Sequence, residues 1–266
     1  MKEVFVACKK NGKLLFKNIH EIQTRNISTM KCMYEADKIY NWGDFVITIR
    51  TSDTCANHEY GYAKNTLYRL IPDFNFWGWP EVGINNYSVT VNEIMMAGEE
   101  PFLSNKIGWI GNLNTSIIRK KLFNFSKKYP TMMDIISMKW SQSTLLKLNA
   151  TQYLSMTDLV KKYAFLIDVE GYGYSGRLKY LLWSQRPILV VDRPYKEYFF
   201  ENLKEWEHYI PVKRDLTDLH EKMMWCFTNT EKANEIAQNA LTFSKKHLTR
   251  EACYAKWNDV IQTLSK

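Results

Sequence analysis

The stretch that most constrains the fold is FLIDVEGYGYSGRLKYLLW, residues 165–183, in which an apolar run leads through a glycine-rich turn into a helical pattern. The run ends at two acidic residues, Asp168 and Glu170. The turn that follows contains three glycines: Gly171, Gly173 and Gly176. A buried strand, a tight turn and a helix form one unit of a parallel α/β sheet. Because such sheets bind ligands at the carboxyl ends of their strands, the turn is a candidate ligand site.

The neighbouring segments repeat this alternation of strand and helix. Apolar or β-branched runs predict strands at 44–50, 107–111, 165–169, 187–192 and 208–213. Helical spacing or length predicts helices at 90–100, 115–129, 156–164, 175–185, 196–204, 216–229 and from about 231 onward. Thr115 or Ser116 is placed to cap the helix at 115–129. The fold class expected from this order is α/β with a parallel sheet.

Strands and helices alternate more regularly in the second half of the chain, and this change predicts a domain boundary near residue 145. We therefore expect an N-terminal domain at 1–145 and a second domain at 146–240. The remaining residues, 241–266, are expected to form a terminal helix.

Composition narrows the class of protein. The 266 residues are 45% hydrophobic and 24% charged, which is enough apolar material for a real core and excludes a disordered chain. No apolar window approaches the roughly 20 residues that span a bilayer, and lysines interrupt the first apolar run, so we expect no signal peptide. Five cysteines without a CxxC pair favour reduced thiols in a cytoplasmic setting over a disulfide scaffold or a zinc site.

The net charge of +8 favours anionic partners. The basic residues are dispersed along the chain, and no basic stripe interleaved with aromatic residues is present, so we expect no nucleic-acid partner. A basic surface is compatible with peripheral contact at the inner face of an anionic membrane.

The glycine turn has the features of a phosphate site. Gly173 and Gly176 allow a ligand to approach the backbone closely, and Ser175 stands where an N-cap would leave free amides and a helix dipole for an anion. Arg177 adds a planar fork that suits a phosphate. The spacing of the three glycines matches the dinucleotide fingerprint, which alone is weak. The alternative is a structural turn in which Arg177 pairs with Asp168 or Glu170.

Longer motifs around the turn favour the phosphate site over the structural turn. Ser175-x-Arg177-x-Lys179 is followed by YKEYFFENLKEWEHYIPV at 195–212, and then by an aspartate–leucine pattern at 215–219. Upstream, IGWIGNLNTSIIR at 107–119 looks like a Trp-Arg-Gly segment in which Ile110 replaces the usual arginine. Together, residues 70–219 resemble glycosyltransferase family 90, which includes capsule-associated, lipopolysaccharide-modifying and protein O-glucosyltransferase-like enzymes.

The resemblance implies two Rossmann-like domains facing a cleft, the glycosyltransferase-B arrangement, with the last helix crossing back to the first domain. In that arrangement residues 1–145 would be the acceptor-side domain and residues 146–240 the nucleotide-sugar-binding domain. It implies transfer of a sugar from a UDP-sugar donor to a hydroxyl of a glycan or glycolipid acceptor. The donor diphosphate would lie at Ser175 and Arg177, with Arg119 or Ser116 helping across the cleft. Other donor-side residues would be Gly173, Tyr174, Gly176, Asp168 and Glu170. Because the chain has no Asp-x-Asp pair, we expect no catalytic metal, and no cofactor beyond the donor.

The acceptor side is less defined. Gly78 stands where the family places its catalytic aspartate, and the nearest carboxylates are Asp73 and Glu81, which become the candidate general bases. Asp73 also fits a turn or cap, and Glu81 a solvent-exposed position. Three tryptophans are candidates for stacking on an acceptor sugar, with burial in the core as the alternative: Trp77, Trp79 and Trp109. A missing base keeps open a second function, a non-catalytic sugar-nucleotide or glycan-binding module.

Overall fold

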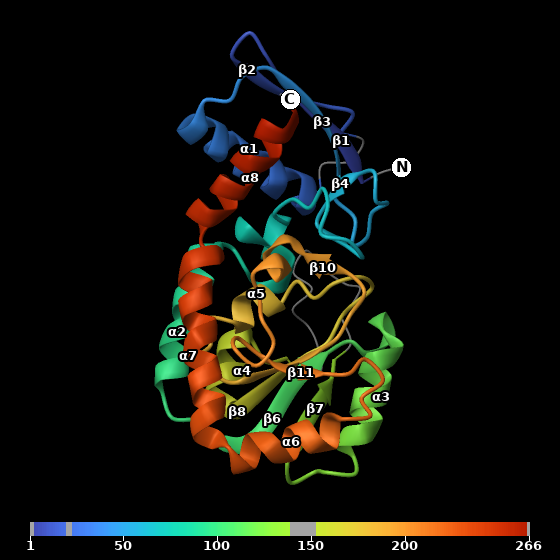
Figure 1. The fold of residues 1–266 in the computed structure, drawn as a ribbon, viewed down its shortest axis with the longest axis vertical. Coiled ribbons are helices and arrows are strands. Elements are labelled where there is room, and N and C mark those ends of the chain that lie inside the picture. Colours follow the sequence, from blue (N-terminus) through green and yellow to red (C-terminus); the bar gives the residue numbers. More distant parts are fainter. Residues whose placement is uncertain (1–2, 20–22, 139–152, 265–266) are drawn as a thin grey trace.

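A computed structural model describes residues 3–19, 23–138 and 153–264. The described chain forms two units (Figure 1). We call residues 3–86 together with the last helix the N-terminal unit, and residues 87–247 the C-terminal unit. In the described ranges no helix is long and apolar enough to cross a bilayer.

The C-terminal unit is built on a five-stranded parallel sheet with the order β11-β9-β8-β6-β7. Its strands are β6 (Ser104–Gly111), β7 (Met133–Ser137), β8 (Tyr163–Asp168), β9 (Ile188–Val191) and β11 (Ile210–Val212). All residues of β8 and β9 are buried, because helices cover both faces of the sheet. This sheet confirms the α/β class and the expected strands at 107–111, 165–169, 187–192 and 208–213.

Helices connect and cover these strands. They are α2 (Tyr87–Glu99), α3 (Ile117–Ser126), α4 (Met156–Lys162), α5 (Leu178–Leu181), α6 (Leu219–Thr228) and α7 (Thr230–His247). Ser116 caps α3 by accepting a hydrogen bond from the Ile118 amide at 3.1 Å. Alternate residues of β8 face two different apolar clusters: Phe165 and Ile167 pack with α3 and α6, whereas Leu166 packs with the helices of the other face.

The N-terminal unit contains a four-stranded sheet with the order β2-β1-β3-β4, in which only the short β3–β4 pair is parallel. Its strands are β1 (Val4–Lys10), β2 (Lys13–Lys17), β3 (Phe45–Arg50) and β4 (Tyr60–Gly61). Helix α1 (Thr24–Tyr40) packs on the short 3₁₀ helix η1 (Phe74–Phe76), and a second 3₁₀ helix, η2 (Pro80–Val82), follows. In the described ranges the sheet of the N-terminal unit is therefore mainly antiparallel, whereas that of the C-terminal unit is parallel.

The chain returns from α7 to the N-terminal unit through its last helix, and a short strand pair also joins the two units. The last helix, α8 (Arg250–Leu264), packs on α1 and β3, and the Trp42 indole donates to Asn258 at 3.1 Å. In addition, β10 (Lys196–Glu197) of the C-terminal unit pairs with β5 (Ala63–Lys64) of the N-terminal unit. Figure 1 shows α8 leaving the lower unit and lying beside α1.

Three sequence-based expectations are corrected by this architecture. A boundary near residue 145 would cut the five-stranded sheet between β7 and β8, so the C-terminal unit begins much earlier, with α2. The helix expected at 175–185 is only the four residues of α5, because 171–177 form a turn. The helix expected at 196–204 is instead β10 followed by the 3₁₀ helix η4 (Tyr198–Glu201).

Candidate active site

The turn at 171–177 follows β8 and is wedged against the N-terminal unit. It is closed by a hydrogen bond from the Gly171 amide to the Tyr174 carbonyl at 3.0 Å. A Cβ atom on Gly173 would collide with the carbonyl oxygen of Asp53, and one on Gly176 would lie 3.0 Å from the Asn75 amide nitrogen. The glycines are thus required where the backbone of the turn meets the other unit.

Ser175 does not cap a helix, contrary to the sequence-based expectation. Its hydroxyl donates to Asp168 Oδ1 at 2.7 Å, and the residue before α5 is Arg177. Asp168 is 1% exposed and also pairs with Arg193 at 2.6 Å. A four-residue helix without this cap offers little dipole, so side chains rather than helix amides must supply any anion site here.

Glu170 is also committed to another partner. It accepts from both guanidinium nitrogens of Arg214, one of them at 2.7 Å, and from the Ser116 hydroxyl at 3.2 Å. Arg177 therefore pairs with neither Asp168 nor Glu170. Such a pair was expected if the glycine turn were purely structural. Ser116 supports this wall and caps α3, and it does not line the cavity described below.

Arg177 and Arg119 lie over the same indole ring, that of Trp109, with guanidinium carbons 6.0 and 5.2 Å from its centroid. Arg177 donates to the Ile110 carbonyl at 2.6 Å, and Arg119 to the carbonyls of Glu170 and Asn112 at 2.7 and 3.1 Å. The ion pairs of the described ranges involve other arginines, including Arg193 and Arg214, and neither of these two.

Burial acts on both guanidinium groups. It lowers the pKa of Arg177, and burial together with the neighbouring Arg177 charge lowers the pKa of Arg119 to about 10. Two cations held near each other on a buried ring without a carboxylate partner are stabilised by a bound anion. This is the strongest chemical feature of the site.

The two arginines open onto a cavity of about 450 Å³ between the units. From the C-terminal unit it is lined by Ser175, Gly176 and the arginines, and from the N-terminal unit by Asp53, Asn75 and Trp79. Its volume is in the range of small-molecule sites. The tight turn, the basic side chains and the apolar wall therefore meet in one place.

Asp53 is a cavity residue that the sequence did not single out. It follows β3, its side chain is 37% exposed, and it accepts from Arg25 at 2.8 Å. Arg25 also donates to the Thr51 carbonyl at 3.1 Å and lies over the Phe74 ring, so it holds the carboxylate in place. The only available signal was its position just after a predicted strand.

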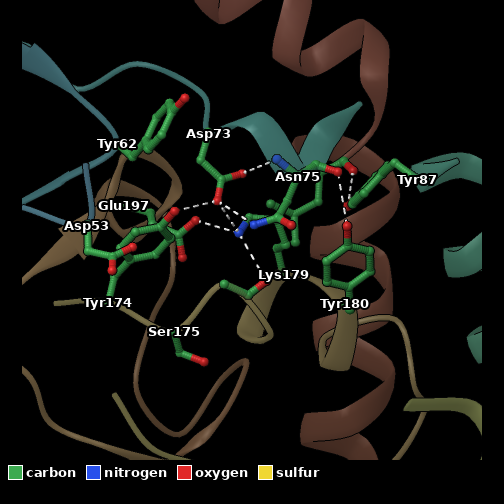
Figure 2. A network of polar contacts seen from close by, with 12 residues as sticks. Asp53, Tyr62, Asp73, Asn75, Tyr87, Tyr174, Ser175, Lys179, Tyr180 and Glu197 are labelled. Atoms are coloured by element: carbon green, nitrogen blue, oxygen red, sulfur yellow. Dashed lines mark hydrogen bonds and ion pairs between the residues drawn. The ribbon is translucent and has the colours of Figure 1, made fainter. Parts of the chain in front are cut away.

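The two candidate bases do not reach the cavity. Asp73 is fully buried, caps η1 by accepting from the Asn75 amide at 3.1 Å, and pairs with Lys179 at 3.0 Å (Figure 2). The turn or cap interpretation of Asp73 is the correct one. Glu81 accepts from the Thr24 hydroxyl and does not line the cavity. The Tyr174 hydroxyl donates to Asp73 at 2.9 Å.

The three tryptophans have different environments. Trp79 lines the cavity and packs edge-on against Phe74. Trp77 lies under the guanidinium of Arg250, 4.5 Å from its ring centroid. Trp109 is 1% exposed beneath the two arginines, so its faces are already occupied. Of the three, Trp79 has the geometry for contact with a sugar.

Comparison with known proteins identifies a family and several relatives that this chain resembles. The model of glycosyl transferase family 90 matches residues 54–266. Protein O-glucosyltransferase 1 of Homo sapiens is 27% identical over 222 residues, covering 78% of this chain and 56% of that protein. Protein O-glucosyltransferase 3 of Homo sapiens is 31% identical over 146 residues, covering 54% of this chain and 29% of that protein. The chain therefore spans little more than half the length of the first relative and less of the second.

Solved structures give weaker likenesses. TarM superposes with a TM-score of 0.43 and 14% identity, over 61% of this chain and 36% of its own. A sucrose-phosphate synthase from Thermosynechococcus elongatus gives a TM-score of 0.40 and 10% identity, over 66% and 42%. Neither likeness carries an argument about this chain.

Proposed function

This chain belongs to glycosyl transferase family 90, and from its site we propose that it moves a sugar from a UDP-sugar to an acceptor hydroxyl without a catalytic metal. The observation that carries the proposal is the pair Arg119 and Arg177 on Trp109, unpaired by carboxylates in the described ranges and open to the cavity. A nucleoside diphosphate leaving group has the charge and the size for this position.

The arginines have a defined part in the reaction. As the bond between the anomeric carbon and the diphosphate oxygen breaks, negative charge grows on the departing UDP. Two preorganised guanidinium groups in a half-buried site stabilise that charge without solvent reorganisation. Arg119 stays protonated at neutral pH, since its lowered pKa of about 10 is far above it.

Asp53 is the carboxylate we propose as the general base. It lies on the opposite unit from the arginines, borders the turn at Gly173, and remains partly exposed to the cavity. In this role it takes the proton of the acceptor hydroxyl while that oxygen forms its bond to the anomeric carbon. The pair with Arg25 holds the carboxylate in place. This assignment replaces Asp73 and Glu81.

The acceptor class has two candidates. The curated relatives are named protein O-glucosyltransferases, which favours a hydroxyl on a polypeptide and glucose as the sugar. The resemblance to capsule and lipopolysaccharide enzymes favours a glycan or glycolipid. For the glycolipid candidate we propose peripheral contact of the basic surface with an anionic membrane, which binding to phosphatidylserine vesicles would test.

The alternative function is a binding module without catalysis. Turnover decides between the two. We expect the protein to release UDP from UDP-glucose, slowly with water alone and faster with an acceptor. UDP binding without any release of UDP from UDP-glucose, UDP-galactose or UDP-xylose would favour the module.

A further inference from the structure

Beside the donor turn lies a fully buried ionic cluster of three residues from three segments. Lys179 of α5 contacts Asp73 at 3.0 Å and Glu197 at 2.7 Å, and each of the three side chains is at most 2% exposed (Figure 2). Asp73 precedes η1 in the N-terminal unit. Glu197 lies on β10, opposite Ala63 of the N-terminal unit. One ammonium group thus pairs with a carboxylate of the N-terminal unit and with a carboxylate on the short strand that is bonded to that unit.

The same cluster holds the donor turn from two sides. The Lys179 ammonium donates to the Gly176 carbonyl at 3.3 Å, and the Tyr174 hydroxyl donates to Asp73 at 2.9 Å. Ser175 lies between these two anchored residues, and Arg177 comes directly after the second. Because Gly176 also packs against Asn75, a change in the cluster must move the backbone that carries Arg177.

We infer that Lys179 is a positioning residue, which fastens the donor turn to the N-terminal unit, and that gain or loss of a proton in its cluster tunes donor binding. The inference rests on the proposed function, because the donor diphosphate is the ligand of the turn. The cluster itself does not line the cavity, so it acts through Arg177 rather than on the substrate.

Charge balance explains why a proton matters here. Two carboxylates share one ammonium, so the cluster is neutral only if one of them is protonated. Burial, opposed by the Lys179 charge, raises the pKa of Glu197 to about 8. The remaining charged neighbour of Glu197 is Arg193, which is itself paired with Asp168. Burial raises the pKa of the tyrosines around the cluster well above the usual value, so these stay neutral: Tyr87, Tyr174, Tyr180 and Tyr198.

The charge of the cluster sets the direction in which donor binding changes with pH. Below about pH 8 the cluster is neutral, and above it the cluster carries one net negative charge beside an anion site. Like-charge repulsion then weakens donor binding as the pH rises. Glu197→Gln keeps the size of the side chain and cannot lose the proton, so it holds the neutral state at every pH.

The experiment combines two readouts on the whole chain. Calorimetry measures the UDP Kd at about pH 7 and about pH 9, where the neutral and charged states dominate. We expect the Kd of the parent to rise by about tenfold, the size of a one-unit coupling, and that of Glu197→Gln to stay constant. Hydrogen exchange follows residues 171–177 without ligand. We expect residues 171–177 to exchange faster in Lys179→Met than in the parent. Lys162→Met is the control, because it removes one exposed positive charge, and its exchange should match that of the parent.

The two readouts separate failures. If the parent does not bind UDP, the proposed function falls, and hydrogen exchange still decides the positioning role. Unchanged exchange of 171–177 in Lys179→Met overturns that role even if UDP binds. Equal pH dependence in the parent and Glu197→Gln overturns the proton effect. If Lys179→Met does not fold, Asp73→Asn, which weakens the same link from the other side, takes its place with the same expectations.

Discussion

At the scale of single residues, the site depends on which charges are paired and which are left open. Asp168 and Glu170, which end the strand β8, are satisfied by Arg193 and Arg214. Within the described residues Arg177 donates to the Ile110 carbonyl, lies over Trp109 and forms no ion pair, so its charge is available to a ligand. The nearby carboxylates are thus part of the wall, and in our proposal the anionic group of the donor is bound by a cation that forms no ion pair with them in the described ranges.

Arg177→Ala tests this assignment directly. Charge-assisted hydrogen bonds contribute roughly 1.5–3 kcal/mol, so we expect the UDP Kd to rise about 10- to 100-fold. Arg177→Lys keeps the charge but loses the planar fork, and should recover only part of the affinity. The thermal midpoint of both variants should stay close to that of the parent, since the residue lines a cavity. UDP binding at parental strength in Arg177→Ala would show that the diphosphate lies elsewhere.

Asp53→Asn separates binding from chemistry. The amide can still accept from Arg25 but cannot take a proton, so turnover should fall by about 10²–10⁴-fold, the range of general-base catalysis. The UDP Kd should change little. Glu93→Gln is the matched control, because Glu93 borders the same cavity from the exposed face of α2. Equal losses of turnover in the two variants would remove Asp53 from the base role.

The raised pKa of Glu197 predicts how the stability of the fold changes with pH. Its pKa is raised to about 8 in the folded chain, from an ordinary value of 4.5. Between these values the unfolded chain has released a proton that the folded chain retains, so the free energy of unfolding falls as the pH rises and levels off above about 8. Urea titrations across this window should show a shallower slope for Glu197→Gln. A parent whose stability rises through the window would contradict a protonated Glu197.

At the scale of elements, the close approach of α2 to the segment after α5 depends on a glycine. A Cβ on Gly98 would collide with the Ser184 carbonyl. Gly98→Ala should therefore destabilise the chain by about 1–3 kcal/mol, the usual cost of overpacking, as measured by urea unfolding. Gly43→Ala is the control, since nothing lies within 4 Å of its Cβ position. A neutral Gly98→Ala would mean that α2 does not pack there.

Four strands of the parallel sheet could be predicted from the sequence, whereas β7 at its edge and the elements fixed by long-range partners could not. The strands β6, β8, β9 and β11 are apolar runs because both faces of the sheet are covered. The helix at 175–185 shrinks to α5 because the Ser175 hydroxyl bonds to Asp168 instead of capping it. The helix at 196–204 is replaced because Glu197 pairs with Lys179 and its backbone with Ala63.

At the scale of the whole molecule, the site exists only where the two units meet. The arginines and the glycine turn belong to the C-terminal unit, and their importance was readable from local motifs. Asp53 and its partner Arg25 belong to the N-terminal unit, whose sheet is mainly antiparallel and whose contacts with the turn join residues about a hundred positions apart in the sequence. No local pattern identifies such a residue, so the sequence alone points to Asp73 and Glu81 instead.

The calorimetric titration of the whole chain with UDP, GDP, CMP and dTDP, with and without EDTA, tests the central claim most directly. The account predicts binding of UDP in preference to the others, unchanged by the chelator, because guanidinium groups rather than a metal ion hold the diphosphate. Absence of binding to every nucleotide would contradict the donor site at Arg119 and Arg177. Binding abolished by EDTA would contradict a metal-independent site.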